Sequence, residues 1–233
     1  FRKDLLAELM KCGHEVFVSL PRGELVEQLV EMGCRFIETP VDRRGINPTT
    51  DIRLLLQYRK LLREVNPDLV VTYTIKPNIY GGLACRSEHI PYAVNITGLG
   101  TAFQREGILK KFVVFLYRIA CKKAKTVFFE NRENAETFLL EKIVDRKQIC
   151  LLPGAGINLT EYPFVPYPKE PGGVRFLFIG RVMREKGVNE LFDAMKELKK
   201  IYPDTELDVV GPYEEDYQSV IEELESSGII HFH

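Results

Sequence analysis

The residues best suited to chemistry are two cations, Arg181 and Lys186, on one short loop. The apolar run 174–179 before them has the composition of a strand, and the apolar residues of 191–198 recur at helical spacing. The cations therefore stand between a strand and the amino end of a helix. A guanidinium, an ammonium group and the positive end of a helix dipole favour a multiply charged anion, and a diphosphate suits them best. In the alternative interpretation, both are ordinary solvated loop residues.

A second apolar run, 207–210, follows that helix and ends at Gly211. The order strand, loop, helix and strand builds a parallel sheet, in which ligands bind beyond the carboxyl ends of the strands. Gly180 and Gly211 each follow one of these strands, so they are predicted to lie at the edge of the sheet where the anion binds. No closely spaced pair of carboxylates stands at a strand end, so no metal ligands are predicted.

The stretch GRVMREKGVNELFDAM, residues 180–195, resembles the donor-site signature of the retaining family-4 glycosyltransferases. Those enzymes have the GT-B fold, in which two Rossmann-like domains face each other. The resemblance implies that Arg181 and Lys186 hold the diphosphate of a nucleotide sugar and stabilise the charge of the leaving group. Gly180 and Gly211 would belong to the same donor site. It further implies retention at the anomeric carbon, with no general base, no cofactor and no metal.

Strands and helices alternate along the rest of the chain, which favours parallel sheets covered by helices. The predicted fold is α/β of the GT-B type, with two Rossmann-like, doubly wound parallel-sheet domains, the second incomplete. Four prolines between Tyr162 and Gly173 mark a linker. Residues 1–165 are predicted as an amino-terminal, acceptor-side domain, and 166–233 as the linker and the first part of a nucleotide-sugar-binding domain. Both ends look cut, because the chain begins in a helix without the strand that normally precedes it and stops inside a strand.

Apolar runs predict strands over 92–96, 126–129 and 147–152. The polar segment 42–50, which contains a glycine and a proline, is predicted as a loop that lines a cleft. A helix is expected to follow it over 54–65.

The segment TIKPNIYGG, residues 74–82, carries a closer resemblance. It is similar to the branch of the family that builds bacterial capsule, O-antigen and lipid-linked oligosaccharides, often by adding hexoses or N-acetylhexosamines to a polyprenyl-diphosphate acceptor. This resemblance implies that Lys76 and Asn78 lie in the acceptor-side cleft, and that the loop with Thr97 and Gly98 lines the same cleft. Many family members carry a histidine near the position of Thr97. None stands there in this chain, so no catalytic histidine is assigned.

Glu130 and Asn131 follow an apolar run that is predicted to be a strand. Side chains at the carboxyl end of a parallel strand face a ligand cleft, so this pair is a candidate for hydrogen bonding to sugar hydroxyls. An equally supported interpretation makes Asn131 the N-cap of the helix that continues to Leu140.

Residues 107–125 contain six basic side chains and no acidic one, interleaved with apolar residues. One interpretation is a core helix with a solvated basic rim. The other is a helix that also rests on anionic lipid at the inner face of the cytoplasmic membrane, which would bring the enzyme to a lipid-linked acceptor. Five scattered cysteines without a Cys-x-x-Cys pair indicate a reducing cytosol, so the predicted location is cytoplasmic in both interpretations. The formal net charge of -1 gives no reason to expect nucleic acid as a partner.

The predicted function is transfer of a hexose or an N-acetylhexosamine from a nucleotide sugar, by resemblance a UDP-sugar, to a lipid-linked glycan acceptor. The family's two glutamates, spaced eight residues apart, would lie downstream of His233. This chain alone is therefore predicted to bind nucleotide weakly and to transfer sugar poorly or not at all. Two alternatives stay open: a half-enzyme or glycan-binding subunit that needs a partner chain, and a nucleotide-sugar epimerase on the same frame. A dinucleotide oxidoreductase is disfavoured because no strand leads into a complete Gly-x-Gly-x-x-Gly loop.

Overall fold

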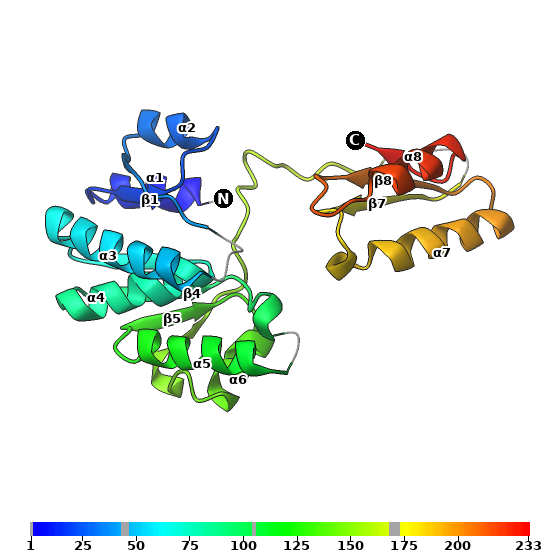
Figure 1. Ribbon diagram of the computed structural model, residues 1–233. Helices are drawn as coiled ribbons and strands as arrows, with labels where there is room; N and C mark the ends of the chain where they lie inside the picture. Colours follow the sequence, from blue (N-terminus) through cyan, green and yellow to red (C-terminus); the bar gives the residue numbers. More distant parts are fainter. Residues whose placement is uncertain (1, 43–46, 104–105, 168–172) are drawn as a thin grey trace. The chain divides into compact units, whose positions relative to one another are not determined.

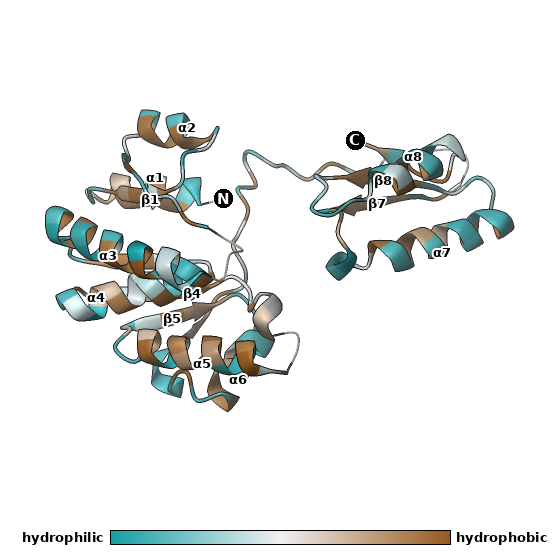
Figure 2. Ribbon diagram, viewed as in Figure 1, coloured by the Kyte–Doolittle hydropathy of each residue, from teal (hydrophilic) through white to brown (hydrophobic). Residues whose placement is uncertain are grey.

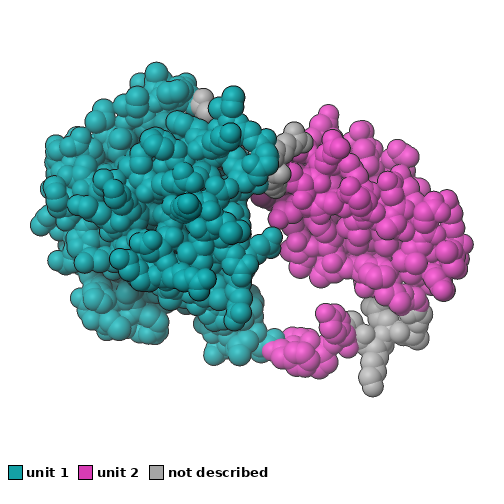
Figure 3. Space-filling model, turned by 90° about the horizontal axis from the view of Figure 1, so that it is seen from below, with its two compact units in different colours: residues 1–163 teal, residues 164–233 magenta. Residues whose placement is uncertain are grey.

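Strands and helices alternate along both halves of the protein, and every strand pair in the described residues is parallel (Figure 1). The structure, a computed structural model, describes residues 2–42, 47–103, 106–167 and 173–233. The chain divides into two compact units, Phe1–Pro163 and Phe164–His233 (Figure 3). Parts of the predicted loop 42–50 and of the predicted linker lie outside the described residues.

Unit 1 is built from short strands joined by helices. In chain order its elements are α1 (Lys3–Lys11), β1 (Phe17–Leu20), α2 (Val26–Glu31), β2 (Arg35–Glu38), α3 (Pro48–Val65), β3 (Val70–Tyr73), a π-helical turn (Pro77–Gly81), α4 (Gly82–Glu88), β4 (Tyr92–Ile96), a 3-10 turn (Thr101–Phe103), α5 (Ile108–Cys121), β5 (Thr126–Phe129), α6 (Arg132–Leu140), a 3-10 turn (Arg146–Gln148) and β6 (Ile149–Leu151). Strand β1 pairs with β2, while β3, β4, β5 and β6 lie side by side in that order.

The core of unit 1 lies between the β3–β6 sheet and helices α3 to α6. All five residues of β4 are buried, as expected for a central strand covered on its faces. Three aromatic rings from different elements meet in this core: the ring of Phe138 lies 5.2 Å from that of Tyr117 and 5.2 Å from that of Phe129, edge to face in both pairs. This packing holds β5, whose carboxyl end carries Glu130 and Asn131, against α5 and α6.

Two of the predicted strands, 92–96 and 126–129, are confirmed with the same bounds as β4 and β5. Two other predictions were wrong in extent. Strand β6 covers only Ile149–Leu151, because the residues before it form a 3-10 turn. Helix α3 begins at Pro48 inside the predicted loop, because the Asn47 side chain accepts a hydrogen bond from the Thr49 N–H at 3.0 Å and Pro48 suits the first helical position.

Unit 2 repeats the pattern in a shorter form. Its elements are β7 (Arg175–Ile179), a 3-10 turn (Arg184–Lys186), α7 (Val188–Ile201), β8 (Glu206–Val210), α8 (Gln218–Ser226) and β9 (His231–Phe232). The three strands form one parallel sheet in the order β7, β8, β9. Apolar side chains of α7 and α8, such as Phe192 and Ile221, pack with Leu207 and Val209 of β8 in a single core. The predicted strand-loop-helix-strand unit is therefore confirmed.

Candidate functional site

The loops that follow β7 and β8 are joined through their backbones at the carboxyl edge of the unit 2 sheet. The Gly180 N–H donates to the Val210 carbonyl at 3.0 Å, and the Val182 N–H donates to the Pro212 carbonyl at 2.9 Å. The Glu214 N–H then donates back to the Val182 carbonyl at 3.1 Å. These bonds extend the parallel pairing past the ends of both strands, so side chains of the two loops are held in a fixed relation.

Gly211 is required for this close approach. Its φ is +142°, and a Cβ placed on it would lie 2.0 Å from the Gly180 carbonyl oxygen. Any other residue would force the two loops apart, since non-bonded carbon and oxygen atoms cannot approach so closely. The two glycines predicted at the donor site, Gly180 and Gly211, thus lie next to each other. The close approach of the two loops explains why residue 211 is a glycine.

Arg181 and Lys186 both lie on the loop between β7 and α7, as the sequence predicted. The Arg181 side chain is half exposed, and its Nη1 lies 3.7 Å from Oε1 of Glu214. Lys186 is exposed at the end of the 3-10 turn, two residues before α7 begins at Val188. An anion held here could contact both cations and the unpaired N–H groups of the first turn of α7.

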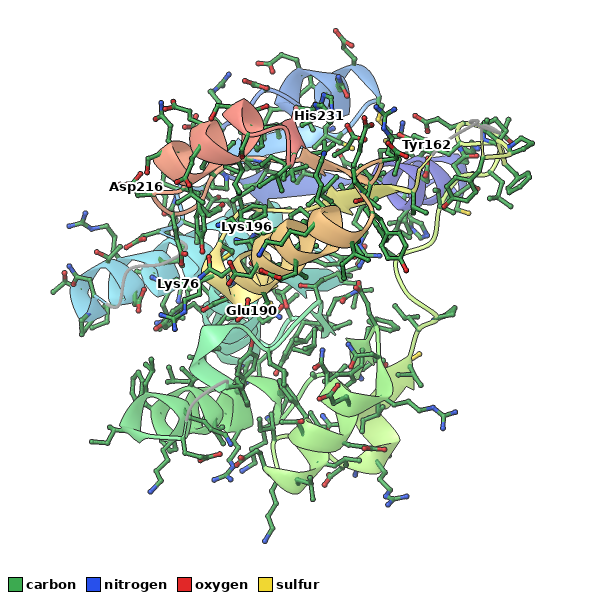
Figure 4. The ribbon with its side chains drawn as sticks, turned by 90° about the vertical axis from the view of Figure 1, so that its right-hand side faces the viewer. Lys76, Tyr162, Glu190, Lys196, Asp216 and His231 are labelled. Atoms are coloured by element: carbon green, nitrogen blue, oxygen red, sulfur yellow. The ribbon has the colours of Figure 1, made fainter. Side chains whose placement is uncertain are left out.

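Carboxylates also surround this edge of the sheet. Glu190 lies in the first turn of α7, and Asp216 lies on the loop before α8 (Figure 4). Glu215 accepts a hydrogen bond from the Arg184 N–H at 2.9 Å. The cations therefore stand in a mixed electrostatic environment, which favours a ligand that carries hydroxyl groups beside its negative charge.

In unit 1, Lys76 belongs to a partly buried cluster at the carboxyl end of β3. Its Nζ lies 2.7 Å from Oδ1 of Asp51 in the first turn of α3, and the Tyr80 hydroxyl donates to Oδ2 of Asp51 at 2.9 Å. The Lys76 and Asp51 side chains are only 13% and 14% exposed. Burial is the largest cause that raises the pKa of Tyr80, and the hydrogen bond to Asp51 is the second. This hydroxyl therefore stays protonated.

The sequence interpretation missed Asp51 and Tyr80. It ended the loop at residue 50 and began the helix at residue 54, so it did not show that the Asp51 carboxylate projects from the first turn of a helix beside Lys76. The dipeptide Asn47-Pro48 was the available signal, because it has the residue types of an N-cap followed by the first helical position.

Glu130 and Asn131 are both occupied by protein partners. Glu130 forms an ion pair with the guanidinium of Arg2, which also lies over the ring of Tyr73 at 5.2 Å from its centroid. The Asn131 side chain accepts a hydrogen bond from the Asn134 N–H at 2.8 Å, so the N-cap interpretation is confirmed. The structure therefore does not present Glu130 and Asn131 as a free carboxylate and amide pair for binding sugar hydroxyls.

Asn78 does not lie on a cleft surface, and its predicted placement was wrong. It is buried, and its Nδ2 donates to the Asn95 carbonyl at 2.9 Å, which ties the π-helical turn to β4. A short polar side chain next to a strand satisfies a backbone group more readily than it reaches solvent.

The predicted loop after β4 adjoins the turn that carries Lys76. Thr97 is half buried and Gly98 is exposed. At Gly100, with φ at +70°, an added Cβ would lie 2.4 Å from Cδ1 of Ile75, so the two loops are in direct contact. The structure therefore brings Lys76, Thr97 and Gly98 to one edge of the unit 1 sheet.

Within the described ranges, no group of three or more His, Cys, Asp or Glu side chains is arranged to hold a metal ion.

The carboxylate of Asp208 on β8 lies 3.2 Å from Nε of Arg175 and 2.7 Å from Nε2 of His233. Hydrogen bonding to His233 is the largest cause that lowers the pKa of Asp208.

Two parallel α/β units, the second with a cation-bearing loop at the carboxyl edge of its sheet, are consistent with the GT-B class of proteins. A family model described as "Glycosyl transferase 4-like" matches residues 1–131, and one described as "Glycosyl transferases group 1" matches residues 164–233. The first match covers more than half of the protein, so the chain belongs to the glycosyltransferase 4-like family.

Two characterised relatives are bacterial transferases. The N,N'-diacetylbacillosaminyl-diphospho-undecaprenol alpha-1,3-N-acetylgalactosaminyltransferase of Campylobacter jejuni is 27% identical over 249 residues, covering 100% of this chain and 65% of the relative. The UDP-Gal:alpha-D-GlcNAc-diphosphoundecaprenol alpha-1,3-galactosyltransferase of Escherichia coli is 28% identical over 144 residues, covering 60% of this chain and 36% of the relative. The chain thus spans less than two thirds of the length of either relative.

Solved structures confirm the fold. Alr3699/HepE of Anabaena, crystallised with UDP and glucose, is similar with a TM-score of 0.70 at 15% identity, covering 99% of this chain and 64% of that one. A glycosyltransferase of Rickettsia africae is similar with a TM-score of 0.68 at 19% identity, covering 100% of this chain and 63% of that one. At such identities the likeness shows the GT-B fold alone.

Proposed function

We propose that the protein is a retaining glycosyltransferase that moves a hexose or an N-acetylhexosamine from a UDP-sugar to a lipid-linked glycan acceptor in bacterial surface polysaccharide synthesis. The observation that carries the proposal is the position of Arg181 and Lys186 at the amino end of α7, in a member of the glycosyltransferase 4-like family. The acceptor class is supported by the names of both relatives, which contain a sugar linked to diphospho-undecaprenol. The uridine donor is supported by the name of the E. coli relative.

In the proposed reaction the bond between the anomeric carbon and the donor diphosphate breaks, and an acceptor hydroxyl oxygen forms the new bond on the same face. The acceptor proton passes to the leaving diphosphate. Arg181 and Lys186 stabilise the negative charge that grows on that group, so the proposal requires no general base and no metal.

Titration with UDP, UDP-sugars and NAD tests the donor class. Replacing Arg181 by Ala removes one charged hydrogen-bond donor, which corresponds to about a 10- to 100-fold weaker affinity for UDP. Arg184 lies on the same loop and carries the same charge, so R184A is the matched control and should weaken UDP binding by less than about threefold. Equal effects of the two changes, or NAD binding in place of UDP binding, would overturn the proposal.

We further propose that α5 rests on anionic lipid. Of the helices in the described residues, none is both long and apolar enough to cross a bilayer. Helix α5 is nevertheless rich in apolar residues (Figure 2). Ile108, Phe112 and Phe115 follow one stripe of the helix and are 88%, 51% and 55% exposed. Lys111 and Lys122 are exposed on the same element and just beyond it. Apolar side chains beside basic ones suit the interface of a membrane with negative headgroups.

Two of the six basic residues in this region are held by the protein and are poor probes of lipid binding. Lys110 is 14% exposed and lies 3.1 Å from a carboxylate oxygen of Glu141, while the Arg118 guanidinium donates to the Glu141 carbonyl. The informative variants are therefore K111E/K122E and F112S/F115S.

Vesicle flotation tests this membrane contact. Both double variants should lose most binding to vesicles that contain phosphatidylglycerol. Helix α3 exposes Ile52 and Leu56 to a similar degree, so I52S/L56S is the matched control and should bind as the unchanged protein does. Unchanged binding of K111E/K122E and F112S/F115S would contradict the proposal.

A further inference from the structure

The connection from β3 to α4 has two unusual backbone features in succession. Thr74, the residue after β3, has a φ of +66°. This region is unfavourable for a β-branched side chain, and such strain persists only where the surrounding structure imposes it. The next turn, Pro77–Gly81, is π-helical, a rare geometry that is frequent at functional sites. Lys76 lies between these two features in the chain.

The side chains around this turn form a polar cluster with spare hydrogen-bonding capacity. The Lys76 ammonium group has three N–H donors, one of which serves Asp51 at 2.7 Å. The Asp51 carboxylate accepts from Lys76 and from Tyr80, which leaves lone pairs on both oxygens. The Tyr80 bond, 2.9 Å long, fixes the orientation of the carboxylate. The cluster therefore offers one oriented donor and one oriented acceptor side by side.

We propose that Lys76 and Asp51 bind two neighbouring hydroxyl groups of the sugar on the acceptor, with Tyr80 as the residue that positions Asp51. The ammonium group donates to one hydroxyl oxygen and the carboxylate accepts from the other hydroxyl. This inference rests on the proposed function, because it assigns the acceptor sugar to a site in unit 1. It adds two residues, Asp51 and Tyr80, and a ligand class to that function.

The charge of the cluster distinguishes a sugar from a phosphate group. One ammonium and one carboxylate at 2.7 Å nearly cancel, so a diphosphate gains little attraction there. The pair is also largely removed from solvent, which strengthens each hydrogen bond to a neutral hydroxyl. Lys186 in unit 2 differs in both respects, because its side chain is exposed and no carboxylate lies within ion-pair distance of it among the described residues.

Binding of two lipids that differ only in the sugar tests this assignment. The probes are alpha-D-GlcNAc-diphospho-undecaprenol and undecaprenyl diphosphate, each in the same detergent micelles. The variants D51N and K76M should each weaken binding of the sugar-bearing lipid about tenfold or more, because each removes one charged hydrogen bond. Binding of undecaprenyl diphosphate should change by less than twofold. K76R keeps a donor and should retain more affinity than K76M, and Y80F should lie between D51N and the unchanged protein.

Glu88 provides a matched structural control. It is 12% exposed and pairs with Arg59 and Arg63, so E88Q makes a change of the same kind in the same two helices. Arg59 and Arg63 lie about two to three helical turns beyond Asp51 along α3, so this pair is distant from the carboxyl edge of the sheet. E88Q should leave binding of both lipids unchanged.

Each contrary outcome has a definite meaning. Equal weakening of both lipids by D51N, weakening by E88Q as large as by D51N, or no binding of the sugar-bearing lipid at all would overturn the assignment. Titration of the same variants with UDP keeps the two proposals separate. If the unchanged protein does not bind UDP, the donor proposal is refuted. If D51N binds both UDP and the sugar-bearing lipid as tightly as the unchanged protein does, only the proposed sugar site is refuted.

Discussion

The close contact of the loops after β7 and β8 makes a quantitative prediction for Gly211→Ala. A non-glycine residue at φ +142° costs about 1–2 kcal/mol. The added Cβ would also lie 2.0 Å from the Gly180 carbonyl oxygen, and relieving such an overlap by moving backbone costs about 1–3 kcal/mol more. The expected loss is therefore about 2–5 kcal/mol. A unit of this size has about 4–10 kcal/mol of stability, so the loss would be a large part of it.

Gly228→Ala separates the two contributions. Gly228 also belongs to unit 2 and has a φ of +66°, but an added Cβ would meet nothing within 4 Å. Hydrogen exchange measured peptide by peptide reports the opening free energy of each unit separately. The opening free energy of unit 2 should fall by about 1–3 kcal/mol more in G211A than in G228A, while unit 1 stays unchanged. Equal losses in the two variants would refute the close-contact argument.

Three further predictions concern unit 1. Hydrogen bonds from Arg63 and then Arg59 lower the pKa of Glu88 from 4.5 to about 2, so the pair stabilises the fold above pH 4.5 and loses this effect as the pH falls towards 2. In urea titrations the stability difference between the unchanged protein and E88Q should shrink over that range; a constant difference would contradict it. Thr74→Asn should raise the free energy of unfolding by about 1 kcal/mol, since asparagine tolerates positive φ, and a decrease in melting temperature would argue against strain. Asn131→Ala should lower it by about 1 kcal/mol through loss of the helix cap, which urea denaturation measures, and no change would contradict that role.

The elements whose signals are local could be predicted from the sequence. Strands β4 and β5 are apolar runs bounded by polar or turn residues, so their ends were predicted without knowledge of the fold. The loop with Arg181 and Lys186 was placed correctly because the helical spacing of α7 and the following strand fix the parallel arrangement. The local sequence pattern was sufficient to place a residue wherever its position depended on neighbouring elements in the chain alone.

Contacts between distant segments could not be predicted in this way. Arg2 meets Glu130 across 128 positions, and Lys76 meets Asp51 across 25, so neither pair leaves a local pattern. Burial could not be predicted from local pattern either. Asn78 is buried and donates to a carbonyl of β4 instead of facing a cleft. A polar residue near a predicted site is therefore a weaker indicator of binding than a charged residue on an exposed loop, because tertiary packing can consume its hydrogen bonds.

The position at which UDP binds is the central claim to measure. Hydrogen exchange of the protein with and without saturating UDP locates the site to within a peptide. Bound UDP should slow exchange in peptides that contain residues 180–190, which include Arg181, Lys186 and the first turn of α7, and R181A should lose this effect. Slower exchange confined to unit 1, or no change at 180–190 while UDP is bound, would contradict it.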